Sequence, residues 1–133
     1  MAPNTTFNFE PVFVANAAGN LFNCAVTSMA GPVGITLGQP VAYLKHIRLT
    51  NNDTVAHTVT LYKGATGGST AGTEFAFAGV SIPAKGAGSV NWVDWYGAAG
   101  GARFASTDFL TGVADLASKV TITIEGEVGF LSA

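Results

Sequence analysis

Hydrophobic and polar residues alternate with a period of two along most of this chain, as they do in half-buried β-strands. The clearest run is VTITIEGEVGF at 120–130, where valine and isoleucine would face inward and threonine and glutamate outward. No segment has a long helical period, although 111–119 is expected to hold one helical turn. The pattern predicts an all-β protein, an antiparallel β-sandwich with a jelly-roll-like topology. About eight strands are expected, and the segments that predict them are 21–28, 41–50, 57–63, 74–83 (as one strand or two), 89–96, 103–110 and 120–130.

The segment YLKHIRLTNNDTVAHTVTLYKG, from Tyr43 to Gly64, predicts two adjacent strands joined by a polar turn, because asparagine and aspartate favour turn backbone. In its first strand Tyr43, Ile47 and Leu49 would face the core, and His46 would lie on the outer side. If the apolar residues of the second strand share that core face, the pairing register of a hairpin follows.

Residues 1–20 are predicted to form an extended N-terminal arm ahead of a β-sandwich domain at 21–133. The prolines of this segment and its asparagine- and alanine-rich composition disfavour a helix. The arm is too apolar for a solvated tail, so we expect it to lie either on its own sandwich or on a neighbouring molecule. The residues that would anchor it are Phe7, Phe9, Val12 and Phe13.

Charged residues make up only 11% of the 133 residues, whereas 48% are hydrophobic. A typical soluble domain has roughly 25% charged residues, so this composition favours a protein that lies against other proteins. The six basic residues are scattered and the net charge is −2, which argues against nucleic acid as a partner. No window predicts a membrane span, a membrane-binding helix or a signal peptide. Cys24 is the only cysteine, which excludes an intramolecular disulfide.

The two histidines, His46 and His57, do not belong to a recognisable catalytic or metal-binding motif. No third ligand stands at the spacing of a metal site, so both are interpreted as strand histidines on an outer face. Neither a nucleophile motif nor a phosphate-binding loop is present in the sequence.

Four carboxylates could form a site of another kind. Glu125 and Glu127 share one face of the last strand, where paired carboxylates could act in acid–base chemistry. Together with Asp108 and Asp115 they could bind calcium, although no EF-hand spacing is present. The favoured interpretation is a solvated strand end, and we expect no enzymatic activity, no catalytic residue, no cofactor and no metal.

The segment SVNWVDWY at 89–96 combines three aromatic residues on one strand. Trp92 and Tyr96 would share a face, and Trp95 would point the other way. One set could fill the core while the other is exposed. Exposed rings of this kind can form a subunit interface or stack on sugar rings, and these alternatives stay open here.

Several segments resemble small virion proteins of tailed bacteriophages, among them capsid decoration (cement) proteins and some minor tail proteins. The resemblance rests on a strand that ends in LTN, a partner strand VTLYKG, an IPA turn and the segment LTGVADLASKVTITIEGE, and it covers residues 41–128. It implies a β-sandwich on the outer surface of the capsid, synthesised in the cytoplasm of the host bacterium. It also implies binding to the major capsid protein, commonly as a homotrimer, which stabilises the shell.

On this interpretation the arm and the aromatic strand would form the contacts with the capsid or with other subunits, through Phe7, Phe9, Val12, Phe13, Trp92, Trp95 and Tyr96. The first alternative is a tail- or fibre-associated module that binds host-surface carbohydrate through the aromatic strand and the glycine-rich loops. The second is a sandwich enzyme with an unrecognised site.

Overall fold

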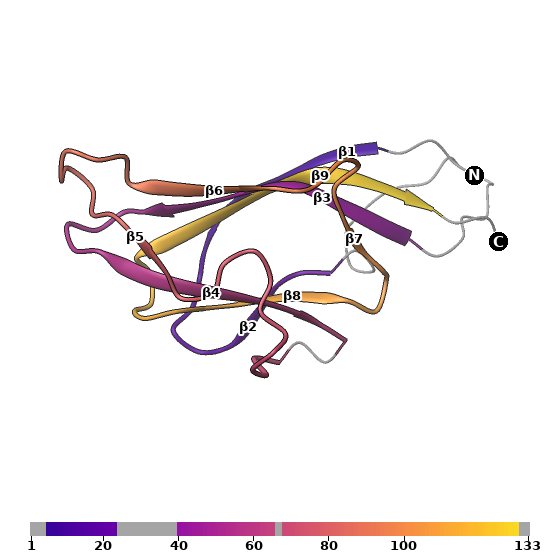
Figure 1. Cartoon of the computed structure of the whole chain (residues 1–133), viewed down its shortest axis with the longest axis horizontal. Helices are drawn as coiled ribbons and strands as arrows, with labels where there is room; N and C mark the ends of the chain where they lie inside the picture. The colour runs from indigo at the N-terminus through magenta and orange to yellow at the C-terminus, as the bar shows by residue number, and fades with distance from the viewer. Residues whose placement is uncertain (1–4, 24–39, 66–67, 131–133) are drawn as a thin grey trace.

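The computed structural model describes residues 5–23, 40–65 and 68–130, and within these ranges the chain forms nine strands and no helix. Figure 1 shows the strands stacked in two layers. The strands are β1 (Thr5–Phe13), β2 (Gly19–Phe22), β3 (Pro40–Asn51), β4 (His57–Gly64), β5 (Val80–Ile82), β6 (Trp92–Tyr96), β7 (Ala102–Phe104), β8 (Phe109–Ala114) and β9 (Val120–Phe130).

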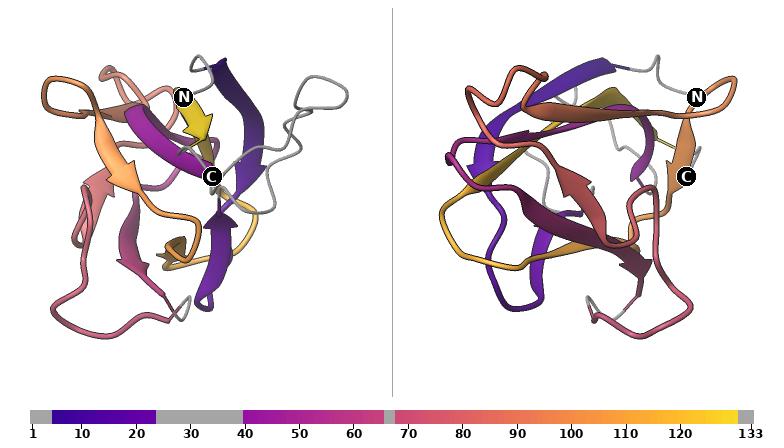
Figure 2. Two further views of the ribbon diagram at one scale, coloured as in Figure 1. Left: turned by 90° about the vertical axis from the view of Figure 1, so that its right-hand side faces the viewer. Right: turned by 60° about the vertical axis from the view of Figure 1, so that its left-hand side comes forward.

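The two layers are antiparallel sheets, which confirms the predicted β-sandwich. Sheet A has the strand order β1-β9-β3-β6, and β7 also pairs with β3. Sheet B has the order β2-β8-β4-β5. Figure 2 shows the same layers from two other directions. The chain therefore crosses between sheets repeatedly, and the jelly-roll-like topology stays a prediction.

The core lies between the sheets and is built from the inward residues of both. Ile47 and Leu49 of β3 and Val59 and Leu61 of β4 belong to one buried cluster, as their alternation predicts. The predicted hairpin between these strands is wrong, however. β3 pairs with β9, β6 and β7, whereas β4 pairs with β5 and β8. The connection after Asn51 carries the chain across the space between the sheets, so the two strands face each other through their side chains.

A bulge in β3 changes which residues face the core. The register between β3 and β9 shifts between Leu44 and His46, and Lys45 has no partner in it. A single extra residue reverses the inward–outward alternation. Leu44 is therefore buried on one side of the bulge and Ile47 on the other. Tyr43 lies half-buried on the outer side, so its predicted place in the core is wrong.

The segment predicted as an arm is extended, and it belongs to the sandwich itself. β1 pairs with β9 from Thr5 to Phe13, and Val14, the residue that follows, is fully buried. The sequence left open whether the arm lies on its own sandwich or on a neighbouring molecule. In the structure it lies on its own sandwich. The predicted domain boundary after residue 20 falls inside β2.

Other local predictions had mixed outcomes. The last strand matches the predicted 120–130 and buries its valine and isoleucines. The expected helical turn at 111–119 is wrong, because β8 continues to Ala114 and the residues after it form a turn with Ser118 at a φ of 59°. Segment 74–83 contains one short strand, β5. Cys24, and most of the strand predicted at 21–28, lie outside the described residues.

Candidate functional site

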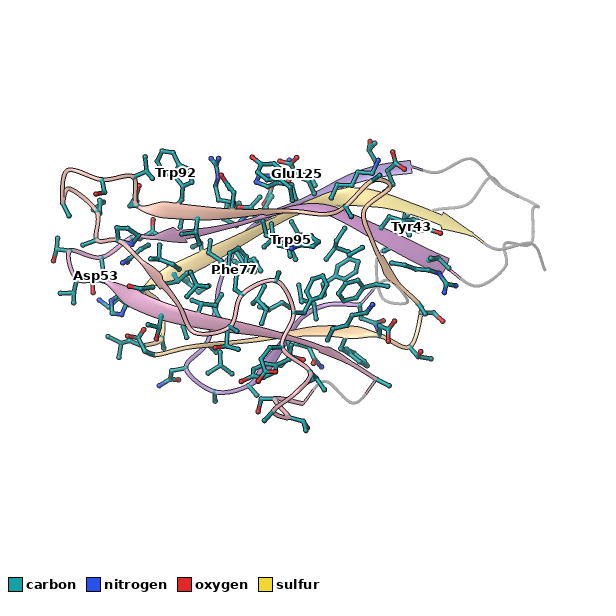
Figure 3. All side chains as sticks on the ribbon, in the orientation of Figure 1. Tyr43, Asp53, Phe77, Trp92, Trp95 and Glu125 are labelled. Carbon is teal, nitrogen blue, oxygen red and sulfur yellow. The ribbon has the colours of Figure 1, made fainter. Side chains whose placement is uncertain are left out.

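The outer side of sheet A carries the aromatic strand β6 beside the charged residues of β3. The register places His46 opposite Tyr96, Arg48 opposite Asp94 and Thr50 opposite Trp92. Trp92 and Glu125 project from the outer side of the sheet, while Trp95 points between the sheets (Figure 3). We call this surface the aromatic face, and it consists of His46, Arg48, Trp92, Asp94 and Tyr96.

Asp94 is the centre of the aromatic face. Arg48 donates to its carboxylate through Nε at 2.7 Å and through Nη2 at 3.0 Å. His46 Nε2 donates to the same carboxylate at 2.9 Å. The hydrogen bonds from Arg48 are the main cause that lowers the pKa of Asp94 to about 2, with His46 adding to the effect and burial opposing it. Asp94 is therefore a carboxylate at any physiological pH.

The two outer rings are held by Arg48 and His46, the two partners of Asp94. The Arg48 guanidinium lies over the Trp92 ring, 5.0 Å from its centroid. The Tyr96 ring stacks on His46 with 4.6 Å between centroids and 9° between planes. Tyr96 is nevertheless 68% exposed. The face thus presents aromatic rings to solvent in fixed orientations.

A hollow of about 500 Å³ adjoins the aromatic face where β1, β9 and the bulge of β3 meet. Its lining is polar, and it connects to the aromatic face through Glu125, whose carboxylate lies 3.9 Å from His46 Nδ1. Lys45, the bulged residue, forms an ion pair with Glu127 at 3.1 Å. The lining residues are Thr6, Asn8, Lys45, Glu125, Gly126 and Glu127.

The predicted division of the aromatic strand is confirmed. Trp92 and Tyr96 share the outer face, and Trp95 packs against the core with its ring 5.1 Å from that of Phe75. Core packing, a subunit interface and sugar binding were considered for Trp95, and in the structure this side chain packs against the core. Asp94 was missed by sequence reasoning, although its place two residues from both Trp92 and Tyr96 puts it on their face by the same alternation.

The predicted arm anchors are divided along β1. Val12 and Phe13 are exposed, at 50% and 55%. The backbone of Phe7 lies opposite Gly126 and that of Phe9 opposite Ile124, but the side chains of these two phenylalanines lie outside the described part of the structure.

A second polar cluster lies at one end of the sandwich, where the β3–β4 and β8–β9 connections meet. His57 is only 5% exposed, so its predicted place on an outer face is wrong. Its Nε2 is 2.8 Å from Asp53 Oδ2 and its Nδ1 is 2.9 Å from Asp115 Oδ1. Lys119 lies 3.8 Å from the Asp53 carboxylate. We call these four residues the loop-end cluster, and Figure 3 marks its place with Asp53.

The electrostatics of the loop-end cluster favour a charged imidazole. The hydrogen bond to Asp53 is the main cause that raises the pKa of His57, with burial opposing it and Asp115 adding to it. The hydrogen bond from His57, and then the backbone N–H of Thr54, lower the pKa of Asp53. Because both ring nitrogens face carboxylates, His57 has no nitrogen left for a metal or for proton transfer to a substrate. The loop-end cluster therefore holds the β3–β4 and β8–β9 connections together through the hydrogen bonds of His57.

The four carboxylates considered for calcium are not brought together. Asp115 is in the loop-end cluster, and Asp108 accepts a hydrogen bond from the backbone N–H of Ala105 at 2.9 Å. Glu125 and Glu127 lie on the outer side of sheet A. Over the described ranges, no three residues of the types that ligate metals are arranged so that they could hold a metal ion.

Comparisons with known proteins do not assign the chain. No protein-family model matches it, and no curated protein matches it in sequence. Among the described residues there is also no helix that could span a membrane.

Proposed function

We propose that the protein is a non-enzymatic structural component of a bacteriophage virion, a decoration protein that binds the outer surface of the capsid and stabilises the shell. The observation that best supports this proposal is β1. It is an edge strand of sheet A, and its neighbour within the described chain is β9 alone. An edge strand offers backbone groups on which a strand of another protein can pair.

The sequence of β1 limits which part of this edge can accept a partner. Pro11 cannot donate a backbone hydrogen bond, and the register shifts between Phe9 and Val12. Both features protect an edge from indiscriminate pairing. The stretch Thr5–Phe9 is thus the segment open to a partner strand, and the exposed Val12 and Phe13 beyond it offer apolar contacts.

The partners that we propose are the major capsid protein and other copies of this chain, arranged as a homotrimer. The low content of charged residues supports such a role, because few charges must be desolvated when surfaces meet. Many copies on a symmetric shell would add their contacts together, so each single contact can be modest.

The test begins with immunogold electron microscopy of purified virions. Gold spread over the heads is expected, and gold confined to the tail would contradict the proposal. Deleting the arm is unsuitable as a second test, because removing residues 2–14 would take away β1 and the buried Val14.

A double substitution is the better second test. Val12→Asp with Phe13→Asp places charges on side chains that are already exposed, so the fold should persist. Co-sedimentation with purified capsids should be lost. The matched control is Leu116→Asp, which changes an exposed apolar residue in the β8–β9 connection and should leave co-sedimentation intact. Equal binding by all three proteins would refute a role for β1.

A further inference from the structure

We propose that the aromatic face and the adjoining hollow form a binding site for a neutral oligosaccharide. The inference goes beyond capsid decoration, since it gives the outer side of sheet A a ligand of its own. It rests on the juxtaposition of two outward rings, the Asp94–Arg48 ion pair between them, and a hollow lined by hydroxyl, amide, ammonium and carboxylate side chains.

The two rings set the size of the ligand. Trp92 and Tyr96 lie four residues apart on one strand, which separates them by roughly 13 Å at about 3.3 Å per residue. Aromatic faces pack against the C–H faces of sugar rings, because both surfaces are apolar and flat. The separation exceeds the width of one pyranose ring. A ligand that contacts both rings is therefore an oligosaccharide.

The groups between the rings suit sugar hydroxyls, which both donate and accept hydrogen bonds. The Arg48 side chain is 40% exposed even though it binds Asp94, so part of its guanidinium is open to solvent. Further along the face, the hollow offers the hydroxyl of Thr6, the amide of Asn8 and the carboxylate of Glu125. Donors and acceptors thus continue from the rings on β6 across sheet A to β9 and β1.

The arrangement is already ordered before a ligand arrives. Asp94 fixes both Arg48 and His46, and these two in turn pack on the rings of Trp92 and Tyr96. A ligand therefore need not immobilise these side chains, which removes one of the usual entropic costs of binding.

The composition of the face favours a saccharide over a protein partner. The central residues of a protein contact are usually desolvated and apolar, with polar groups around them. Here the polar groups lie between the rings. Of the exposed aliphatic residues, Val55, Val90 and Leu116 lie in loops, and Val12 lies on β1 at the other edge of sheet A. The face and the hollow carry three carboxylates, Asp94, Glu125 and Glu127, against one arginine and one lysine, which favours a neutral ligand over an acidic one.

The test is a glycan array of neutral and acidic oligosaccharides probed with the whole chain, followed by calorimetric titration. The titration uses cellohexaose, maltohexaose and chitohexaose, and the disaccharide of each series. We expect at least one neutral hexasaccharide to bind, and its disaccharide to bind at least tenfold more weakly. Trp92→Ala and Tyr96→Ala should each weaken binding about tenfold.

The matched control is Tyr62→Ala, which removes a half-buried aromatic ring from sheet B and should leave the affinity unchanged. Circular dichroism confirms that each variant is folded. The proposal is wrong if no neutral glycan on the array or in the titrations binds, or if binding survives the loss of both rings. It is equally wrong if the ring variants lose self-association or capsid binding instead, since the face would then be a protein interface. These saccharide assays need no capsid, so their failure would leave the decoration proposal standing.

Discussion

The aromatic face and the loop-end cluster are both built around a histidine hydrogen-bonded to aspartate, but the first is a surface open to solvent and the second is a buried connection between loops. In both, a histidine nitrogen lies 2.8–2.9 Å from an aspartate oxygen. His46 has one nitrogen bonded to Asp94, while its ring supports the exposed Tyr96. His57 is buried, with both nitrogens bonded to carboxylates from different connections. One pair therefore orders a surface, and the other joins loops.

The difference shows that burial, and not residue type, decides what a histidine–aspartate pair contributes. A buried charge must have all its partners, because an unsatisfied one is costly. At the loop end, Asp53 and Asp115 supply those partners, and the loops are fixed as a result. On the aromatic face, water can replace any lost partner, so the pair contributes orientation more than stability.

The largest effect is expected beside the loop-end cluster, at Asn51. This fully buried side chain donates to the carbonyls of Val55 at 2.8 Å and Ile82 at 3.1 Å, and accepts from the N–H of Asp53 at 2.9 Å. Asn51→Leu keeps the number and branching of the side-chain heavy atoms and removes all three bonds. We expect a loss of about 3 kcal/mol in the free energy of unfolding, at about 1 kcal/mol for each bond, measured by urea denaturation.

The control for this variant is its neighbour. Asn52 is exposed, and its side-chain hydrogen bonds are 3.3–3.5 Å long. Asn52→Leu should therefore change stability by less than about 0.5 kcal/mol. Similar losses in the free energy of unfolding for both variants would show that burial does not determine what these two asparagines contribute to stability.

The next effect is expected at Gly97, which follows Tyr96 and so positions the aromatic face. Its N–H donates to the Lys45 carbonyl at 2.9 Å, and a Cβ here would lie 2.7 Å from the carbonyl oxygen of Leu44. Gly97→Ala should cost about 2 kcal/mol, because the turn must move away from β3. Gly64→Ala is the control, since no atom lies within 4 Å of its Cβ position. If Gly97→Ala unfolds at the same denaturant concentration as the native chain, the turn is not constrained by β3.

The pH dependence of stability should distinguish the two histidines. The pKa of His57 is raised above 6.5 by folding, so its contribution is complete below that pH and is lost as the pH rises through the folded-state pKa. The melting temperature of the native chain should therefore fall as the pH rises above 6.5. In His57→Gln this fall should be reduced, whereas His46→Gln should retain it. A fall that is unchanged in His57→Gln would contradict the assignment.

The smallest effect is expected for Asp94→Asn. The loss of the Arg48 and His46 interactions should cost less than about 1 kcal/mol, because the pair is partly open to solvent. Since folding lowers the pKa of Asp94 to about 2, the difference from the native chain should persist at neutral pH and close as the pH falls from about 4 towards 2. Chemical denaturation of both proteins at pH 7 and at pH 3 measures the loss of stability at neutral pH and its decrease in acid. A loss as large as that of Asn51→Leu would remove the contrast between the two regions.

Sequence alternation predicted the faces of most strands but not their partners. It placed Trp92 and Tyr96 on one face of their strand and Trp95 on the other, without saying which face is buried, and it placed the residues of β9 correctly, because each of these depends only on local geometry. Pairing depends on the whole chain. The polar turn after β3 is compatible with a hairpin. In the structure β3 and β4 instead lie in different sheets, and their apolar sides pack against each other and are both buried.

The remaining errors come from single residues whose surroundings lie far away in sequence. No local signal marks the bulge at Lys45, where the alternation reverses. His57 lies on the buried side of β4 with Val59 and Leu61, as alternation would place it, but its partner Asp115 is 58 residues away. The loop-end cluster was missed, because Asp53 was interpreted only as a turn residue and Asp115 only as a possible calcium ligand.

The position of β9 has a consequence for how the protein is made. β9 lies between β1 and β3 in sheet A, but the ribosome releases it after both of them. Until residues 120–130 have emerged, the nascent chain carries two strands whose shared partner does not yet exist. Sheet A can therefore close only late in synthesis, and pairings between such distant segments form slowly. A chain that stops short of β9 would present unpaired strand edges to its neighbours and is expected to aggregate.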